Sequence, residues 1–349
     1  MHKRVALVLG AILILSTLTV SGWVSAAKTR LVITGWGGLY EEAFREQVVK
    51  PFQAKYNCDI ELVNPGSSTQ ILARLRAERR SPTIDLVQIG GGLEAVCAAE
   101  GLVENVDYTK LSNWRDLLRD ATRYPAFGPG GSLSATGLLY HTGRMPFTPT
   151  SWYDLWDPRL AGEGKVGVHN IDGNFGLALM TIINELEGGS RSNLNPGFAK
   201  FASLMKTHNP LIALGSDSPT TDIVQRGAYM TVCPQSRAIE LMRTGYPVKF
   251  VYPKEGAFSW PTSIGIVKGT KNLELAKEFI NFFISPEINA KWAMHVNYTP
   301  VNAKANISRY DHADALMPKA IYGLDWEWIN AQRAAWIERW NMEVLSLSR

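Results

Sequence analysis

The chain alternates short apolar strands with amphipathic helices, and this alternation most constrains its fold. The apolar periodicities predict strands over 30–35, 59–63 and 85–89, and helices over 38–56, 68–80 and 93–100. Strands that alternate with helices form layered α/β domains in which the strands run parallel. The first third of the chain therefore predicts a parallel α/β domain.

A second series of the same kind begins near residue 165. It predicts strands over 165–169, 211–214, 229–233 and 248–252, and helices over 175–186, 220–226 and 236–244. A strand over 263–267 and helices over 273–284, 286–295 and within 318–347 follow. Two α/β lobes would then be joined by extended segments near 134–141 and 255–263, and such double crossings permit hinge motion.

Aromatic, small and hydrogen-bonding residues follow the strands of both series. Ligands of open α/β sheets bind beyond the carboxyl ends of the strands, so two such edges that face each other would form a closing cleft. Helix capping, turn formation or core packing could explain each residue alone, but caps explain neither tryptophan nor Arg237. The candidate cleft residues are Trp36, Gly37, Tyr40, Ser67, Gly91, Asp172, Asp217, Arg237, Trp260 and Thr262.

Asp172 lies in GVHNIDGNFGLALM, residues 167–180, where a predicted strand gives way to a helix. We expect this residue both to cap the helix and to offer its carboxylate to the cleft. The partial positive charge at a helix N-terminus would keep the carboxylate ionised, as an ammonium ligand requires.

The N-terminus has the pattern of a secretory signal peptide over residues 1–26. Lys3 and Arg4 precede the uncharged run Val5–Val20, and small residues follow. The run is shorter than the roughly 20 residues of a spanning helix, which favours cleavage over the alternative of an uncleaved anchor. The mature chain of about 320 residues suits two domains. The predicted lobes are 27–137 with 257–310, and 138–256 with 311–349.

Charge and cysteine content argue against several classes of protein. The 36 Lys and Arg residues fall to 34 without Lys3 and Arg4, against 32 Asp and Glu, and this near-neutral balance gives no footprint for nucleic acid. Three cysteines cannot form a disulfide framework, although the sequence leaves a Cys58–Cys97 pair open. No spacing resembles a zinc site, so no metal is expected.

Catalytic and cofactor motifs are weak in this sequence. GGGLEA at 90–95 fits a loose dinucleotide fingerprint, but it follows the third strand and no acidic strand end follows at the required spacing. A Cys233 nucleophile would need His169 within hydrogen-bond reach across the cleft. The sequence therefore predicts neither a cofactor nor an enzyme.

Four segments, spread over nearly the whole mature chain, resemble the extracellular solute-binding family 1, in the cluster of spermidine/putrescine-binding proteins. They are TGWGGLYEEAFREQVVKPFQAKY (34–56), TSWYDLWDPRLAGEGKVGV (150–168), FVYPKEGAFSWPTSIGIVKGTKN (250–272) and LAKEFINFFISPEINAKWAMHVNYTPVNAKA (275–305). The resemblance implies a bilobal α/β fold of the type II periplasmic-binding-protein class, with crossing strands and a ligand cleft between the lobes. It also implies a monomeric periplasmic receptor that delivers a small-molecule solute to ABC permease subunits in the inner membrane.

The resemblance also implies a ligand chemistry. Polyamine binders of the family pack tryptophans on the methylene chain and hold each ammonium with an acid, and Trp36, Trp260 and Asp172 match such positions. The family's W-x-D motif departs here, because Thr262 replaces the acid. One acid together with Arg237 favours a zwitterion such as an ω-amino acid over a symmetric diamine. A polyamine ligand, a sensory receptor and a secreted enzyme on the same fold are the alternatives.

Overall fold

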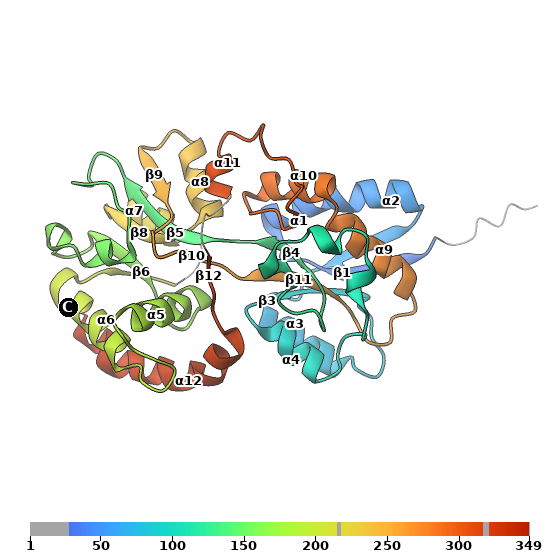
Figure 1. The fold of residues 1–349 in the computed structure, drawn as a ribbon, viewed down its shortest axis with the longest axis horizontal. Coiled ribbons are helices and arrows are strands. Elements are labelled where there is room, and N and C mark those ends of the chain that lie inside the picture. The colour runs from blue at the N-terminus through green and yellow to red at the C-terminus, as the bar shows by residue number, and fades with distance from the viewer. Residues whose placement is uncertain (1–27, 215–217, 317–320, 349) are drawn as a thin grey trace, which may run out of the picture.

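Two β-sheets organise the computed structural model, which describes residues 28–214, 218–316 and 321–348 (Figure 1). The strands are β1 (Arg30–Thr34), β2 (Asp59–Val63), β3 (Leu86–Gly90), β4 (Gly130–Leu133), β5 (Thr136–His141), β6 (Val166–His169), β7 (Leu211–Ala213), β8 (Met230–Pro234), β9 (Val248–Val251), β10 (Ala257–Phe258), β11 (Pro261–Ile266) and β12 (Ile321–Tyr322). The first sheet has the order β2-β1-β3-β11-β4, and the second has the order β12-β10-β5-β8-β6-β7, with β9 paired to β5. We call the two sheets with their helices the first and second lobes.

Helices cover the sheets of both lobes (Figure 1). They are α1 (Gly38–Phe44), α2 (Lys50–Tyr56), α3 (Ser68–Ala77), α4 (Leu93–Ala99), α5 (Asn174–Leu186), α6 (Asn195–His208), α7 (Ser218–Val224), α8 (Gln235–Arg243), α9 (Leu273–Phe283), α10 (Pro286–Val296), α11 (Ala313–Leu316) and α12 (Trp326–Glu343). A π-helical turn, Arg45–Val49, joins α1 to α2 and makes them one continuous helical segment, as the sequence predicts. Short 3₁₀ turns lie at Tyr108–Lys110, Trp114–Asp116, Arg119–Thr122, Trp152–Trp156, Pro158–Leu160 and Leu345–Leu347.

Local sequence signals set several helix ends. The side chain of Ser67 accepts from the backbone N–H of Gln70, whose own side chain accepts from the N–H of Ser67, and this capping box starts α3. Helices α2, α6 and α10 end at Asn57, Asn209 and Asn297, each with a positive φ. Asparagine tolerates this left-handed conformation better than other non-glycine residues, so these helices stop where the sequence supplies one.

The chain crosses between the lobes in extended conformation. β4 of the first sheet continues into β5 of the second, and β10 of the second sheet continues into β11 of the first. Both crossings fall in segments predicted to be extended. A further passage follows α10, because β12 pairs with β10 in the second sheet and leads to α12 (Figure 1). The crossings therefore connect the first sheet directly to the second.

Two features of the fold differ from the sequence-based expectation. The first sheet is mixed rather than parallel, since β11 runs antiparallel to β3 and to β4. β11 arrives directly from the other lobe, so no crossover helix dictates its direction. Strand–helix alternation also does not predict β4 or α6, although Phe198, Phe201, Leu204 and Met205 bury one face of α6. Helix α12 lies within the segment 318–347, predicted to be helical, where residues 321–322 form β12 instead.

The predicted signal peptide, residues 1–26, lies outside the described residues. Within the ranges that the structure describes, no helix combines the length and the apolar character that crossing a membrane requires.

A buried carboxyl group ties α4 to β11 inside the first lobe. Glu94 is fully buried. Its carboxyl oxygens accept from the backbone N–H of Gly92 at 2.9 Å and from Ser263 Oγ at 3.0 Å. Burial raises the pKa of Glu94 to about 8, because the low-dielectric interior disfavours the charged form. The folded protein therefore holds this carboxyl protonated near neutral pH.

This raised pKa predicts a falling stability with rising pH. Between the ordinary value of 4.5 and about 8, the unfolded chain releases the Glu94 proton while the folded chain keeps it, so the free energy of unfolding decreases across that window. Glu94→Gln removes this contribution and keeps a side chain that can bond Gly92 and Ser263. Urea unfolding of both proteins at pH 5 and pH 8 measures it. An identical pH dependence in the two proteins would contradict the protonated state.

Candidate functional site

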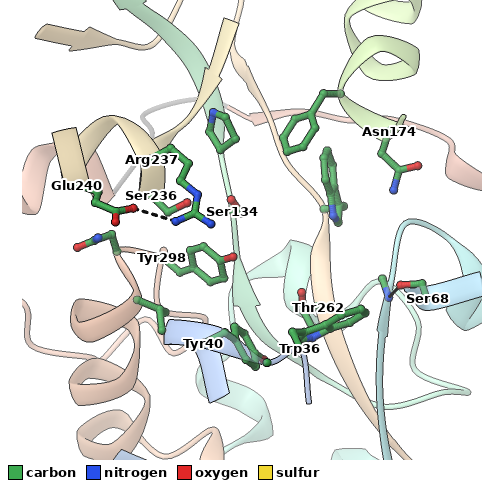
Figure 2. Close-up of a pocket in the computed structure, with 17 residues that line it drawn as sticks. Trp36, Tyr40, Ser68, Ser134, Asn174, Ser236, Arg237, Glu240, Thr262 and Tyr298 are labelled. Atoms are coloured by element: carbon green, nitrogen blue, oxygen red, sulfur yellow. Dashed lines mark hydrogen bonds and ion pairs between the residues drawn. The ribbon is translucent and has the colours of Figure 1, made fainter. Parts of the chain in front are cut away.

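A cavity of about 480 Å³ lies between the lobes, and both lobes contribute to its wall (Figure 2). Cavities of this size are typical of small-molecule sites. The lining residues are Trp36, Gly37, Tyr40, Ser68, Gly90, Ser134, Asn174, Phe175, Pro234, Ser236, Arg237, Glu240, Trp260, Thr262, Val296, Asn297 and Tyr298.

Most of these residues sit just past a strand or at the start of the helix that follows it. Trp36 and Gly37 follow β1, Asn174 begins α5 after β6, and Arg237 lies in the first turn of α8 after β8. Trp260 lies in the second crossing, between β10 and β11. The site therefore lies where the strand ends of the lobes and the crossings between the lobes come together.

The structure brings six of the sequence-predicted residues together around the cavity: Trp36, Gly37, Tyr40, Arg237, Trp260 and Thr262. Ser67 and Gly91 are each one residue away from a lining residue. Ser67 is exposed and caps α3, and the carbonyl of Gly91 accepts a hydrogen bond from Asn330 Nδ2 at 2.7 Å. Asp217 lies outside the described residues.

Asp172 does not line the cavity. Its residue is exposed, and α5 begins at Asn174 with Gly173 as the N-cap and no side-chain capping bond, so the predicted capping role of Asp172 is wrong. Arg333 of α12 donates to the main-chain carbonyl of Asp172 at 2.9 Å and to Asn174 Oδ1. These bonds hold the loop that precedes α5, and Asn174 rather than Asp172 lines the cavity.

One end of the cavity carries an ion pair. Arg237 Nη1 lies 2.8 Å from Glu240 Oε2, one turn further along α8, and both side chains are partly exposed. Glu240 is the only carboxylate among the lining residues that the structure describes. The i, i+3 spacing of the two residues on a predicted helix is a sequence signal that could have identified Glu240.

Aromatic rings form much of the rest of the wall. Tyr40 and Tyr298 lie with ring centroids 6.3 Å apart, and Trp292 packs edge-on behind Tyr40 at 5.2 Å. Burial raises the pKa of Tyr40 well above its usual range, and its hydroxyl donates to Gln88 Oε1, so the ring is a neutral wall. Tyr298 follows the left-handed Asn297 at the end of α10, a position with no strand-end signal.

The crossing strand carries the other aromatic wall. Trp260 packs edge-on against Phe175 at 5.0 Å and against Trp326 at 5.3 Å. Behind Phe175, the buried ring of His169 is stacked at 4.6 Å, and burial lowers the pKa of His169 to about 4. The second wall is therefore also uncharged and held by neighbouring rings.

Neither the cysteines nor a metal cluster supplies chemistry at this cavity. All three cysteines are buried and none is in a disulfide, so the Cys58–Cys97 pair that the sequence left open is not formed. Cys233 donates to the carbonyl of Pro234, and neither Cys233 nor His169 lines the cavity. In the described part of the chain, no group of three or more His, Cys, Asp or Glu residues could hold a metal ion.

Comparisons with known proteins agree with this geometry. The family model for bacterial extracellular solute-binding proteins matches residues 47–319. A spermidine/putrescine-binding periplasmic protein of Escherichia coli is 26% identical over 277 residues, covering 77% of this chain and 75% of that protein. A gamma-aminobutyric acid-binding protein of Pseudomonas aeruginosa is 24% identical over 313 residues, covering 85% and 81%. An extracellular solute-binding protein of Bordetella parapertussis has a solved structure with a TM-score of 0.77, at 20% identity and coverage of 90% and 98%.

The family match spans well over half of the chain, and the solved relative confirms the bilobal fold predicted from the sequence. The relatives are periplasmic or extracellular proteins that bind a solute for an ABC transporter and are not enzymes. The chain belongs to the family of bacterial extracellular solute-binding proteins, as the solute-binding component of an ABC transporter.

Proposed function

We propose that this protein captures a small zwitterionic amine, of the ω-amino acid type, and delivers it to ABC permease subunits in the inner membrane. One observation carries the proposal: the only carboxylate among the described lining residues is already paired with Arg237. A symmetric diamine needs an acid at each end, and the lining residues that the structure describes do not supply two. A guanidinium at one end suits the carboxylate of an amino acid, which it can hold by two parallel hydrogen bonds.

The relatives support an amine-containing solute without choosing between the two chemistries. The Escherichia coli protein is named for spermidine and putrescine, and the Pseudomonas aeruginosa protein for gamma-aminobutyric acid. The choice of a zwitterion therefore comes from Arg237 and from Thr262, which stands two residues after Trp260 and carries no charge. Trp36 and Trp260 would stack on the apolar part of the solute and attract its cation, each by about 0.5–2 kcal/mol.

Capture requires the lobes to close, and a polar contact between them supports this part of the proposal. Asn330 of α12, in the second lobe, donates to the carbonyl of Gly91 in the first lobe at 2.7 Å. Arg333 in turn donates to Asn330 Oδ1 at 2.9 Å and to Asn174 Oδ1. Because Asn174 also lines the cavity, the interlobe contact and the binding site share a residue (Figure 2).

The chain segments of the receptor follow from the same proposal. Residues 1–26 would direct export and be removed. The first lobe would comprise 27–137 and 257–310, and the second lobe 138–256 and 311–349. The sheets support these boundaries to within a few residues, since β5 begins at Thr136 and β10, at Ala257–Phe258, still belongs to the second sheet.

Replacing Arg237 tests the carboxylate end. Arg237→Gln should weaken binding of γ-aminobutyrate by about 10- to 100-fold, because a charge-assisted hydrogen bond is lost, and should not weaken putrescine binding, because Glu240 is then unpaired. Titration calorimetry with γ-aminobutyrate, putrescine and spermidine measures both. Arg45→Gln, which removes a similar exposed i, i+4 ion pair on another helix, is the control. Tight diamine binding by the unaltered protein, with no response to γ-aminobutyrate, would contradict the proposal.

Thr262 allows the missing acid to be restored. Thr262→Asp places a carboxylate at the tryptophan end, so putrescine affinity should rise by about tenfold or more through charge-assisted hydrogen bonds. Thr262→Asn has nearly the same shape without the charge and should leave putrescine affinity unchanged. The same calorimetry compares the two variants. Equal putrescine affinities for the Asp and Asn variants would show that residue 262 does not face the ammonium position.

Gly92 allows the interlobe contact to be disturbed without touching the cavity. Its φ is 87°, and a Cβ at this residue would lie 2.6 Å from the Cβ of Trp326 and 2.8 Å from Asn330 Nδ2. Gly92→Ala should therefore hold the lobes apart and lower solute affinity by about tenfold or more. Gly101→Ala carries a similar backbone strain, at φ 62°, with only the tip of Arg79 nearby, and is the matched control. X-ray scattering in the presence of solute should show a larger particle for Gly92→Ala alone; equal profiles for both variants would exclude a role in closure.

A further inference from the structure

We infer that the aromatic end of the cavity accepts a methylated ammonium group, so that the solute is a quaternary-ammonium carboxylate rather than a primary amino acid. This inference rests on the proposed function, because it keeps Arg237 as the partner of the carboxylate. It differs in the chemistry of the other end of the cavity, where the described residues provide ring faces but no carboxylate.

The charged and aromatic ends of the cavity are separate. Figure 2 shows Arg237, Ser236 and Glu240 on one side and Trp36, Ser68 and Asn174 on the other. A solute whose carboxylate lies against Arg237 therefore places its cation near the tryptophans. Because Glu240 is 2.8 Å from Arg237, it belongs to the first end and not to the second.

The described lining residues place no carboxylate at the aromatic end to accept from N–H groups. A primary ammonium carries three N–H donors that need oxygen partners once water is excluded. Asn174 Oδ1 already accepts from Arg333 and keeps one lone pair, and Asn174 Nδ2 is a donor. The indole N–H groups of Trp36 and Trp260 are also donors. The other side-chain acceptors among the described residues at this end are the hydroxyls of Ser68 and Thr262, and Ser68 Oγ already accepts one bond from the N–H of Gly90 at 3.3 Å. Two of these three oxygens thus already hold one donor each, and none of them is a carboxylate.

The same end is rich in fixed aromatic faces. The rings of Trp36, Tyr40 and Trp260 are each partly buried, with part of each ring on the cavity. Trp292 packs edge-on against Tyr40, and Trp326 packs edge-on against Trp260, so the rings cannot readily turn away. Aromatic faces bind quaternary ammonium groups well, since the methyl groups spread the positive charge over a surface that needs no acceptor.

Calorimetry on the unaltered protein with three carboxylates tests the inference. 4-(Trimethylammonio)butanoate should bind at least tenfold more tightly than 4-aminobutanoate, because its cation leaves no N–H unsatisfied. It should also bind more tightly than 5,5-dimethylhexanoate, which has the same shape with carbon in place of the charged nitrogen. Binding of 4-aminobutanoate that equals or exceeds binding of the trimethylated compound would overturn the inference and leave the proposed function intact. Failure of both amino compounds to bind would overturn the proposed function as well.

Two substitutions of Trp36 separate attraction to the charge from simple packing. Trp36→Leu should reduce the preference for the trimethylammonium compound over its uncharged carbon analogue by threefold or more, whereas Trp36→Phe should retain more of it. Circular dichroism confirms that each variant is folded. An equal loss of affinity for the charged and the uncharged compound would show that Trp36 acts only by packing. If a variant does not fold, the comparison of the three ligands on the unaltered protein decides the inference.

Discussion

The whole arrangement depends on backbone hydrogen bonding that continues through the junction of the lobes. Thr136 of β5 pairs with Phe258 of β10 in one sheet, and Leu133 of β4 pairs with Pro261 of β11 in the other, so two crossing strands are held at both of their ends. Ser134 and Trp260 lie on these short crossings and line the cavity. Residues that are separated by more than one hundred positions in the chain therefore meet at one place. The lobes can rotate about the crossings without either sheet losing its pairing.

The chemistry of the cavity follows from how few charges the fold brings to it. Glu94 is buried nearby in the first lobe but holds its proton, and His169, behind the second aromatic wall, is kept uncharged by burial. Arg237 and Glu240 are thus the charged groups among the described lining residues, and they neutralise each other. A solute gains affinity at this site by interacting with one ion pair and with a large area of ring surface. The site therefore favours molecules that carry both a carboxylate and an apolar cation.

Much of the fold could be predicted from the sequence, because the local periodicity of apolar residues predicts each strand and helix from β1 to α4. The rule that ligands bind beyond strand ends could also be applied, because it depends only on the order of elements along the chain. The lining residues were less predictable, because the direction of a side chain decides whether it reaches the cavity. Ser68 and Gly90 line the cavity where Ser67 and Gly91 were expected, since the direction of a side chain changes with each residue and the rule does not fix it. Asp172 is exposed and does not line the cavity. Arg333, on a helix far along the chain, donates to its main-chain carbonyl, and no local pattern reports such a contact.

Helix α12 makes contacts that only a nearly complete chain can form. Figure 1 shows it as the red helix of the second lobe, and its Asn330 and Arg333 reach the loop after β3 and the start of α5. A ribosome makes this helix after both sheets and after every residue that lines the cavity. A nascent chain that still lacks α12 contains every described residue of the cavity wall but not Asn330 and Arg333. The bond from Asn330 across the lobes can therefore form only after nearly the whole described chain has been made.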